Sequence, residues 1–389
     1  MQKYKIDWLS FSVKCYDEEP TNTLDENLLE LLGYDFKEFE KCSGKNFYNQ
    51  GATLGNYVSV YWNDYTDKKN PVRRNSSKTM NVVYTGQGST DLALKNDNDW
   101  AKIFSILTTY EPKNKPKVEA EAKPSVNITR IDIALDDYDG LVKFDDLEKK
   151  LQKGHYRSSK RSYNIVKTSD QFGQKLGETI YIGNARTASG SRGNVYARFY
   201  DKLAQYREKN QLVMSDVREH WEKTGKEVWQ RYEISYSKNY TNSIVEAILN
   251  GESIDRIFKG SLRNLLEILT ARGTDTNKNR WYKTRWWEDF LQYDDRKGFD
   301  LPERDVMLAE TLEWLRVAVL PSLNVLEKIG KERGFDIYDL LRNSRKPSEL
   351  SKKQSRLIAD TRDKSDEKIN EYLTKFLLGV EIEKERGGK

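Results

Sequence analysis

Charged and phenolic side chains recur at every second position along three segments of this chain, residues 127–136, 194–202 and 228–237. The positions between them are mostly apolar or tyrosine. Successive side chains of a β-strand point to opposite faces, so each segment predicts a strand with one apolar and one polar face. If the apolar faces pack on the same helices, the opposite face gathers one set of polar side chains: Arg130, Asp132, Asp136, Arg198, Tyr200, Lys202, Arg231 and Glu233.

This set of side chains suits chemistry on a phosphodiester. Two or three carboxylates supply the oxygen ligands that Mg²⁺ or Mn²⁺ prefers, while arginine and lysine hold phosphate oxygens and stabilise developing charge. A tyrosine hydroxyl, with a pKa of about 10, is a poor nucleophile unless a metal or neighbouring cations lower that pKa. Once activated, it can attack DNA and form a phosphotyrosine link, which conserves the bond energy and needs no ATP.

The same pattern also has a purely structural interpretation. Alternating polar faces are common on antiparallel strands, and arginine–carboxylate pairs on neighbouring strands are often surface salt bridges. Tyr196 has the same facing as Tyr200, and the chain has 23 tyrosines, so periodicity does not single out a nucleophile.

Missing residues exclude several classes of enzyme. Only two histidines occur, His155 and His220, so the sequence has neither an HExxH zinc site nor a histidine-hydrophobe-histidine metal site. It also lacks the GxxxxGK[ST] loop of P-loop ATPases and the GxGxxG loop of dinucleotide-binding enzymes. Two cysteines, Cys15 and Cys42, cannot make a disulfide framework, which favours the reducing cytoplasm. No apolar run reaches the roughly 18 residues of a membrane span, so we expect no membrane segment.

Positive charge is concentrated in the middle of the chain. The net charge of the 389 residues is +5, but the window from Leu151 to Tyr200 has nine basic and two acidic residues, a net charge of +7. A polyanion such as DNA would meet this stretch first, although a basic face that contacts only solvent is the alternative. The candidate DNA-binding residues are Arg157, Lys160, Arg161, Lys167, Arg186 and Arg192.

The predicted strands and helices are interspersed without a regular βαβ order, which favours an α+β fold with a largely antiparallel sheet. Strands are expected at 3–13, 56–62, 79–85, 127–136, 179–183, 194–202 and 228–237, and helices at 97–110, 142–153, 243–250 and 254–269. Each half before residue 240 has the order strand, helix, strands, helix, which suggests an internal duplication. We expect an N-terminal part of the core, 1–125, with a linker at 111–125, a catalytic part, 126–298, and a small helical C-terminal domain, 299–389.

Two smaller motifs each have two interpretations. Gly86-Gln87-Gly88 follows a predicted strand, where a plain β-turn is favoured over a backbone approach to phosphate. Trp286 and Trp287 could stack on bases, but Phe290 continues the same helix face and favours packing in the core.

Five segments of the chain follow one another in an order typical of a known family. They are IDWLSFSV near the start, YTGQGS at 84–89, TRIDIALDDYDG at 129–140, YIGNARTASGSRGNVYARFYDK at 181–202 and RYEISY at 231–236, with RWWEDFL at 285–291 as a downstream tryptophan-rich element. In combination they resemble the Rep_trans family, the rolling-circle replication initiators of Gram-positive plasmids and the related relaxases of integrative and conjugative elements. The resemblance covers residues 3–295 and implies a nickase core.

The resemblance implies roles for particular residues. Family members cut DNA with a tyrosine in a segment R-hydrophobe-Y-[DN]-K, here residues 198–202, so Tyr200 is favoured over Tyr196. It also implies a divalent metal, Mg²⁺ or Mn²⁺, with Asp132 and Glu233 as the best-matching ligands and Asp136 as a third candidate. A host DNA helicase and a homodimer are the implied partners. The loop 187–194 is longer than in shorter relatives, which leaves the placement of Arg186 and Arg192 open.

We therefore predict a metal-dependent endonuclease and strand transferase that cuts one DNA strand at an origin of replication or transfer. Tyr200 would form a 5′-phosphotyrosine, and Arg198, Lys202 and Arg130 would neutralise the phosphate. A non-catalytic DNA-binding replication accessory protein and a metal-dependent hydrolase that uses water are the alternatives. The sequence does not separate plasmid replication from conjugative transfer.

Overall fold

A computed structural model of the chain describes residues 1–73, 78–113, 115, 124–183, 194–208, 213–291, 308, 311–312, 315–343, 358, 361–362 and 366–378. The chain divides into two compact units, residues 1–302 and 303–389. Among the helices in the described ranges, none is long and apolar enough to cross a lipid bilayer.

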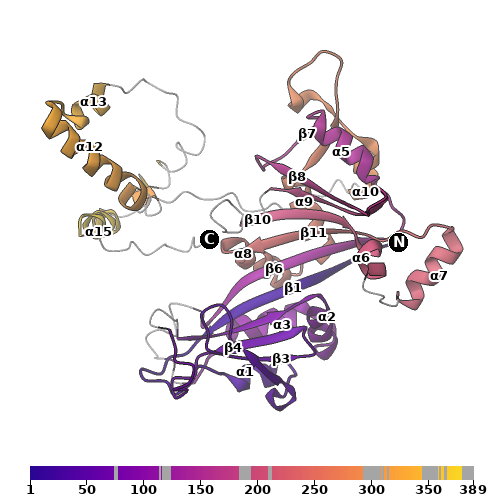
Figure 1. Ribbon diagram of the computed structural model, residues 1–389, viewed down its shortest axis with the longest axis horizontal. Helices are drawn as coiled ribbons and strands as arrows, with labels where there is room; N and C mark the ends of the chain where they lie inside the picture. The colour runs from indigo at the N-terminus through magenta and orange to yellow at the C-terminus, as the bar shows by residue number, and fades with distance from the viewer. Residues whose placement is uncertain are drawn as a thin grey trace. The chain divides into compact units, whose positions relative to one another are not determined.

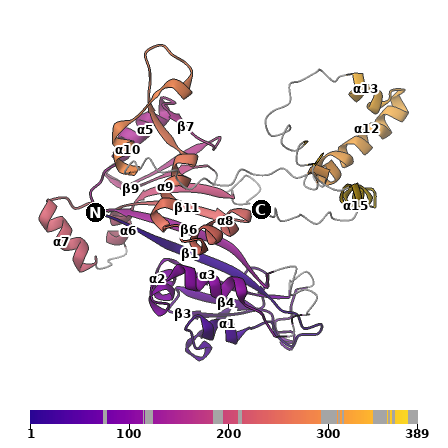
Figure 2. The same cartoon turned by 180° about the vertical axis from the view of Figure 1, so that it is seen from behind.

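An antiparallel sheet, with ten strands among the described residues, forms the centre of the first unit (Figures 1 and 2). Strands β1 (Gln2–Lys14) and β6 (Val126–Asp137) lie side by side in its middle. Outward from β1 follow β5 (Thr79–Tyr84), β4 (Val58–Trp62), β3 (Gln50–Leu54) and β2 (Glu40–Ser43). Outward from β6 follow β11 (Gln230–Ser237), β10 (Val195–Asp201), β9 (Lys175–Ile182) and β8 (Tyr163–Ser169). The predicted α+β class with a largely antiparallel sheet is confirmed.

The two halves of this sheet repeat one order of elements. In the first half, β1 is followed by α1 (Glu26–Leu31), strands β2 to β5, and helices α2 (Gly86–Lys95) and α3 (Trp100–Thr109). In the second half, β6 is followed by α5 (Phe144–Gln152), strands β8 to β11, and helices α8 (Asn239–Leu249) and α9 (Ile254–Leu265). In both halves the last strand returns to lie beside the first. This order agrees with an internal duplication, and it brings one strand of each half to the centre.

One face of the sheet is apolar. Ile131, Ile133 and Leu135 of β6 are buried, as are the inward residues of β10 and β11, such as Phe199 and Ile234. They share one hydrophobic core with the apolar residues of α3, α5, α8 and α9. Burial of each such side chain contributes about 1.5–3 kcal/mol. Because this face is fixed by packing, the alternate residues of the same strands must lie on the opposite face, here called the polar face.

One predicted helix ends earlier than expected. The sequence pattern predicts a helix over 254–269, but α9 ends at Leu265 and residues Glu267–Thr270 form strand β12. This strand pairs with β7 (Tyr156–Arg157) and β13 (Tyr282–Lys283) in a small second sheet. The prediction was too long because leucines at helical spacing continue past Leu265. The strand forms instead because Glu267 pairs with Arg157, which lies 110 residues earlier, and local periodicity does not reveal a pairing over that distance.

The tryptophan-rich segment forms α10 (Arg285–Leu291). Trp287 and Phe290 are fully buried in the main core, where Phe290 packs on Tyr232. The interpretation of this segment as a core-facing helix is therefore confirmed.

The second unit is helical where it is described. A π-helical turn at Leu315–Val319 leads into α12 (Leu320–Arg333), followed by α13 (Ile337–Asn343) and α15 (Asp366–Leu377). Helix α12 has Pro321 in its first turn, where a missing N–H costs nothing, and ends at Gly334 with a φ of 75°. Helices after residue 303 agree with the helical C-terminal region predicted from the sequence.

Candidate active site

A cavity of about 670 Å³ opens on the polar face, where β1 begins and β6 ends. Its walls come from β1, β6, β9, β10 and β11, from the start of α2 and from α6 (Lys202–Glu208). Five members of the predicted polar set line it, namely Asp136, Arg198, Tyr200, Lys202 and Arg231. Strand order therefore brings together side chains that lie up to 95 residues apart in the sequence.

Tyr200 lies on β10, opposite Arg231 of β11 and Thr179 of β9. Its phenol Oη donates a hydrogen bond to Oε1 of Glu233 at 2.6 Å. Burial, and then the negative charge of Glu233, raise the pKa of Tyr200 well above its usual value, although Arg231 and Arg198 act in the opposite direction. The phenol is therefore protonated at neutral pH and needs a proton acceptor before it can attack.

Glu233 is the acceptor that the structure places there. Its side chain lies on β11, is 1% exposed, and binds Arg198 through Oε2 while Oε1 receives the Tyr200 hydroxyl. Burial raises its pKa above the usual value, which Arg198 partly offsets. A carboxylate with a raised pKa is a better base, so the pair Tyr200–Glu233 can move a proton from Oη to Oε1.

Arg231 holds two other carboxylates beside this pair. Its guanidinium donates to Asp136 through Nε at 2.6 Å and Nη2 at 2.7 Å, and to Oδ1 of Asp7 through Nη1 at 2.9 Å. Trp229 Nε1 also donates to Asp136 at 2.8 Å. Burial alone would raise the pKa of Asp7, but the charges of Arg231 and Lys5 outweigh it and lower that pKa. The network fixes the Arg231 guanidinium between two carboxylates in the wall of the cavity.

Asp132 and Arg130 form a further ion pair on β6. Arg130 donates to both carboxylate oxygens of Asp132, through Nε at 2.8 Å and through Nη2. The guanidinium carbon of Arg130 lies 4.3 Å from the ring centroid of Trp8, which lines the cavity. Asp132 is 2% exposed, and its partners across the strands are Trp8 and Ser235. These two predicted site residues therefore lie beyond the Trp8 wall of the cavity.

Lys202 begins α6 directly after the tyrosine strand. Its ammonium lies 5.6 Å from the ring centroid of Tyr200 and donates to Oε1 of Gln205 at 2.6 Å. Burial, followed by the nearby charge of Arg231, lowers the pKa of Lys202 from 10.5 to about 8. The Lys202 side chain is therefore a cation at neutral pH, and it can release a proton near pH 8.

The segment Gly86-Gln87-Gly88 is not a β-turn, so the favoured sequence interpretation was wrong. These residues form the first turn of α2, and Gly86 and Gln87 line the cavity. A Cβ on Gly88 would lie 2.3 Å from the carbonyl oxygen of Tyr57, which shows how closely the helix approaches the strand hairpin. The glycine spacing reflects this packing rather than a turn.

The carboxylates have the right chemistry for a divalent cation. Asp132 and Glu233 are diagonal neighbours on β6 and β11, since Asp132 pairs with Ser235 and Glu233 with Ala134. Among the described residues, no group of three or more histidine, cysteine or acidic side chains is arranged to hold a metal ion. Mg²⁺ commonly takes one or two carboxylates and completes its shell with water and substrate phosphate, so two acidic residues are enough in number. Arg130 binds both oxygens of Asp132, and Arg198 and the Tyr200 hydroxyl bind those of Glu233, so a cation would have to displace these partners.

Of the predicted DNA-binding residues, the four that the structure describes do not line the cavity. Arg186 and Arg192 are outside the described residues. Arg157 on β7 pairs with Glu267, and Lys160 and Arg161 lie between β7 and β8. Lys167 on β8 pairs with Glu148 of α5 and Glu178, on the face opposite Tyr200.

Sequence reasoning missed the contribution of β1. Lys5, Asp7 and Trp8 line the cavity, and Asp7 bonds Arg231 directly. Asp7 sits at a bulge between Ile6 and Trp8 in the pairing of β1 with β6. Asp7, the one charged residue of the segment IDWLSFSV, was the available signal.

Comparison with known proteins gives three matches. A family model described as replication initiation factor, Rep_trans, matches residues 126–341, which is more than half of the chain. The putative DNA relaxase NicK of Bacillus subtilis (strain 168) is 23% identical over 239 residues, which is 61% of this chain and 63% of that protein. The chain thus aligns with less than two thirds of that relative's length.

The third match is a solved structure, a rolling circle replication initiator protein from Geobacillus stearothermophilus. The two structures superpose with a TM-score of 0.57 at 25% sequence identity, over 75% of this chain and 96% of that chain. The similarity therefore includes nearly all of the initiator's fold.

Proposed function

This chain belongs to the Rep_trans family of replication initiation factors, and we propose that it cuts one strand of DNA at an origin, as an initiator of rolling-circle replication or as a relaxase. The observation that carries the proposal is the hydrogen bond from Tyr200 to Glu233 in a cavity lined by basic side chains. The similar proteins, a putative DNA relaxase and a rolling-circle initiator, support the same chemistry.

The reaction is an in-line transesterification. Oη of Tyr200 attacks the scissile phosphorus while its proton passes to Oε1 of Glu233, 2.6 Å away. The bond from phosphorus to the 3′ oxygen breaks, and that oxygen takes up a proton, which leaves a 5′-phosphotyrosine and a free 3′ hydroxyl. One phosphodiester replaces another, so a 3′ hydroxyl can later attack the phosphotyrosine and rejoin a strand.

Basic side chains stabilise the charge that builds on the phosphate. Arg198 lies within 5.5 Å of the Tyr200 ring centroid and Lys202 within 5.6 Å, so both flank the nucleophile. Lys202, with its pKa lowered to about 8, is also able to give the proton that the 3′ oxygen needs. Arg130 stands further away, behind Trp8, and contributes through the position of Asp132.

Asp132 and Glu233 would hold a divalent cation, Mg²⁺ or Mn²⁺, with Asp136 as a third candidate. Each of the three carboxylates now binds an arginine, and Glu233 would hold the cation only until it accepts the Tyr200 proton. Such a cation would draw electron density from a phosphate oxygen. Its presence can be tested without catalysis by titrating Mn²⁺ into the protein and following electron paramagnetic resonance. Asp132→Asn should weaken Mn²⁺ binding at least tenfold, whereas Asp146→Asn, on the exposed face of α5, should leave it unchanged.

The partners follow from the same proposal. The substrate is DNA, and the sequence has no P-loop, so strand separation requires another protein such as a host helicase. Action as a homodimer would supply a second tyrosine for strand transfer. Use in plasmid replication and in conjugative transfer requires the same chemistry at Tyr200.

The deciding experiment is a nicking assay on a supercoiled plasmid that carries the origin, in the presence of Mg²⁺. The wild-type chain should give a nicked plasmid and a protein–DNA adduct that survives denaturant. Tyr200→Phe should abolish both, and Tyr196→Phe, a change on the same strand and the same face, should retain them. Chelation should stop nicking and leave DNA binding intact.

Other results identify the alternatives. A nick without an adduct would indicate a hydrolase that uses water. Binding without a nick would indicate a non-catalytic accessory protein. An adduct that persists in Tyr200→Phe would show that another residue is the nucleophile.

A further inference from the structure

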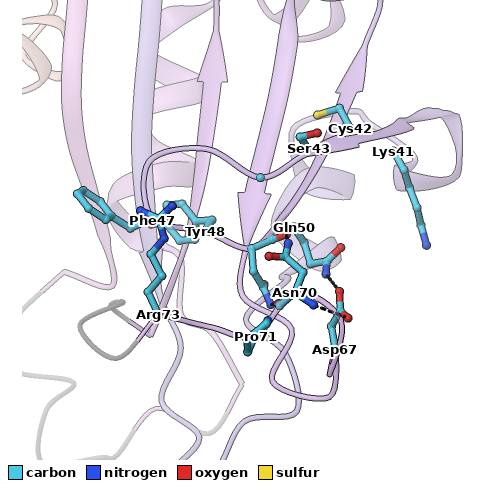
Figure 3. A pocket seen from close by; sticks show the side chains of 12 residues that line it. Lys41, Cys42, Ser43, Phe47, Tyr48, Gln50, Asp67, Asn70, Pro71 and Arg73 are labelled. Carbon is cyan, nitrogen blue, oxygen red and sulfur yellow. Dashed lines mark hydrogen bonds between the residues drawn. The ribbon is translucent and has the colours of Figure 1, made fainter.

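A second cavity, of about 630 Å³, lies in the first half of the sheet (Figure 3). Its walls come from β2, from the loop between β2 and β3 and from the loop after β4. None of the residues discussed above for the candidate active site lines it. We call it the edge cavity, because β2 and β3 are the last two strands on their side of the sheet.

The walls of the edge cavity are built from a fixed hydrogen-bond network. The side-chain amide of Asn49, which is 7% exposed, donates to the backbone carbonyls of Asp64 at 2.8 Å and Asn70 at 2.6 Å. The amide of Asn70 returns a bond to the carbonyl of Asn49 at 2.5 Å, and Gln50 donates to Asp67 at 2.7 Å. Buried amide bonds of this kind tie the two loops together and keep the cavity open.

An aromatic ring stands at the mouth of this cavity. Phe47 is 70% exposed, and its backbone has a φ of 75°, in the left-handed region that bulky residues rarely adopt. Strain of this sort costs about 1–3 kcal/mol and persists at sites where a side chain must be presented. The neighbouring Tyr48 is anchored by its hydroxyl, 2.6 Å from that of Thr79.

Positive charge accompanies the ring. The guanidinium carbon of Arg73 lies 5.8 Å from the Phe47 ring centroid, and Figure 3 shows Phe47, Tyr48 and Arg73 grouped on one side of the cavity. Lys41 stands on the other side. The one acidic lining residue, Asp67, already accepts the backbone N–H groups of Lys69 and Asn70 and the Gln50 amide. Aromatic faces beside arginine and lysine are how proteins hold unpaired nucleotides, by stacking on bases and contacting phosphates.

We propose that the edge cavity binds an unpaired nucleotide of the DNA strand that is cut at Tyr200. The proposal rests on the proposed function for the identity of the strand. Phe47 stacks on the base, and Arg73 contacts the adjacent phosphate. The first half of the sheet then serves as a holding site for single-stranded DNA, while the second half carries the chemistry.

The position of the two cavities sets the length of DNA required. β3 and β10 are six strand positions apart in the sheet, roughly 29 Å across it at about 4.8 Å a step. Along the strands, Tyr200 is level with Lys3 of β1 and the start of β3 is level with the end of β1 near Val13, which adds roughly 33 Å at about 3.3 Å a residue. The two cavities are therefore roughly 44 Å apart. At a stacked rise of about 3.4 Å, a strand needs roughly 13 nucleotides to reach from one cavity to the other. Between them the polar face presents Ser10, Ser12 and Asn81, with the ion pair of Arg130 and Asp132 next to Ser10.

The test is a binding titration with two fluorescent single-stranded oligonucleotides in chelator, so that no strand is cut. The longer one extends well beyond the cleavage site on both sides, and the shorter one covers only the cleavage site. Phe47→Ala and Arg73→Ala should each weaken binding of the longer oligonucleotide about tenfold and leave the shorter one unchanged. Phe47→Trp should bind the longer oligonucleotide like wild type, and the quenching of tryptophan fluorescence should exceed that of wild type only with the longer oligonucleotide.

Phe172 gives a matched control. It is 80% exposed in the turn between β8 and β9, on the opposite edge of the sheet. Phe172→Ala should change binding less than twofold. Equal losses in Phe47→Ala and Phe172→Ala, or no loss in Phe47→Ala, would overturn the proposal. A nicking assay separates this proposal from the proposed function. If the chain does not nick DNA at Tyr200, the nicking assay fails, but the dependence of binding on oligonucleotide length and on Phe47 can still be measured.

Discussion

The phenol oxygen of Tyr200 lies 2.6 Å from Oε1 of Glu233, on the neighbouring strand of the same sheet. Glu233 pairs directly with Arg198, so the tyrosine is its diagonal neighbour two residues along β10. Diagonal neighbours on one face lie within reach of long side chains. Two hydrogen-bonded strands therefore hold the proposed nucleophile and its proposed proton acceptor without help from a loop.

Replacing that acceptor tests its role. Glu233→Gln keeps the shape of the side chain and an oxygen for the Tyr200 hydrogen bond, but an amide cannot take up the proton. Loss of a general base typically costs 10²–10⁴-fold, so we expect single-turnover nicking to fall by at least about 100-fold while DNA binding persists. Glu178→Gln is the matched control, because Glu178 is also buried but pairs with lysines on the opposite face. Nicking within threefold of wild type in Glu233→Gln would exclude the proton transfer.

The pKa of Lys202 predicts how nicking depends on pH. The group is a cation below a pKa of about 8 and neutral above it. We expect the second-order rate constant for nicking, which reports the free enzyme, to fall above pH 8. Lys202→Arg keeps its charge at high pH and should remove this fall, even if its rate is lower throughout. If the rate constant of Lys202→Arg still falls above pH 8, a group other than Lys202 causes the fall.

Titration of Lys202 does not itself destabilise the folded chain as the pH rises. Because the pKa of Lys202 is lower in the folded state, the unfolded chain binds more protons between pH 8 and 10.5. The contribution of this group to stability therefore rises with pH across that window. Denaturant unfolding at both ends of the window separates the two effects.

Arg231 should be the residue on which the stability of the site depends most. Arg231→Met leaves Asp7 and Asp136 buried without their cation, and breaking one partner of a buried ion pair costs about 3–5 kcal/mol. Arg207→Met is the control, because that arginine pairs with Glu227 on the surface, where both side chains are more than half exposed, and should cost at most about 1 kcal/mol. Urea unfolding measures both. If Arg231→Met does not fold, Arg231→Lys is the alternative, because it keeps the charge and loses the bidentate contact. Its free energy of unfolding should lie between those expected for Arg231→Met and Arg207→Met.

The sequence was sufficient for whatever depends on alternation along a strand. It placed Arg198 and Tyr200 on one face, with Phe199 in the core, because period-two burial is a local property. It did not place Asp7, because the pairing of β1 with β6 joins residues more than a hundred positions apart, as in Trp8 and Asp132. Strand order decides which polar faces meet, and no periodicity within a single strand reveals it.

The same limit explains the carboxylates. The sequence grouped Asp132, Asp136 and Glu233 as one set, but each has a different arginine partner in the fold. Which guanidinium reaches which carboxylate depends on register, since Arg231 pairs directly with Asp136 across β11 and β6. The residue types in the sequence indicated the chemistry, but the strand register determines which arginine binds which carboxylate.

Gly88 offers a test of how α2 shapes the cavity. A Cβ at this position would lie 2.3 Å from the backbone oxygen of Tyr57, which already accepts bonds from Thr85, so the carbonyl cannot turn away freely. Gly88→Ala must displace α2, and overpacking of this kind costs about 1–3 kcal/mol. At Gly86 a Cβ would meet the carboxylate of Asp7, with its nearest oxygen at 3.1 Å and no backbone atom among the contacts, so Gly86→Ala should cost less stability than Gly88→Ala. Because Gly86 and Gln87 line the cavity, the displacement in Gly88→Ala should also slow nicking, and thermal unfolding with the nicking assay measures both effects. A Gly88→Ala variant with the stability of wild type would show that α2 does not rest on the Tyr57 carbonyl.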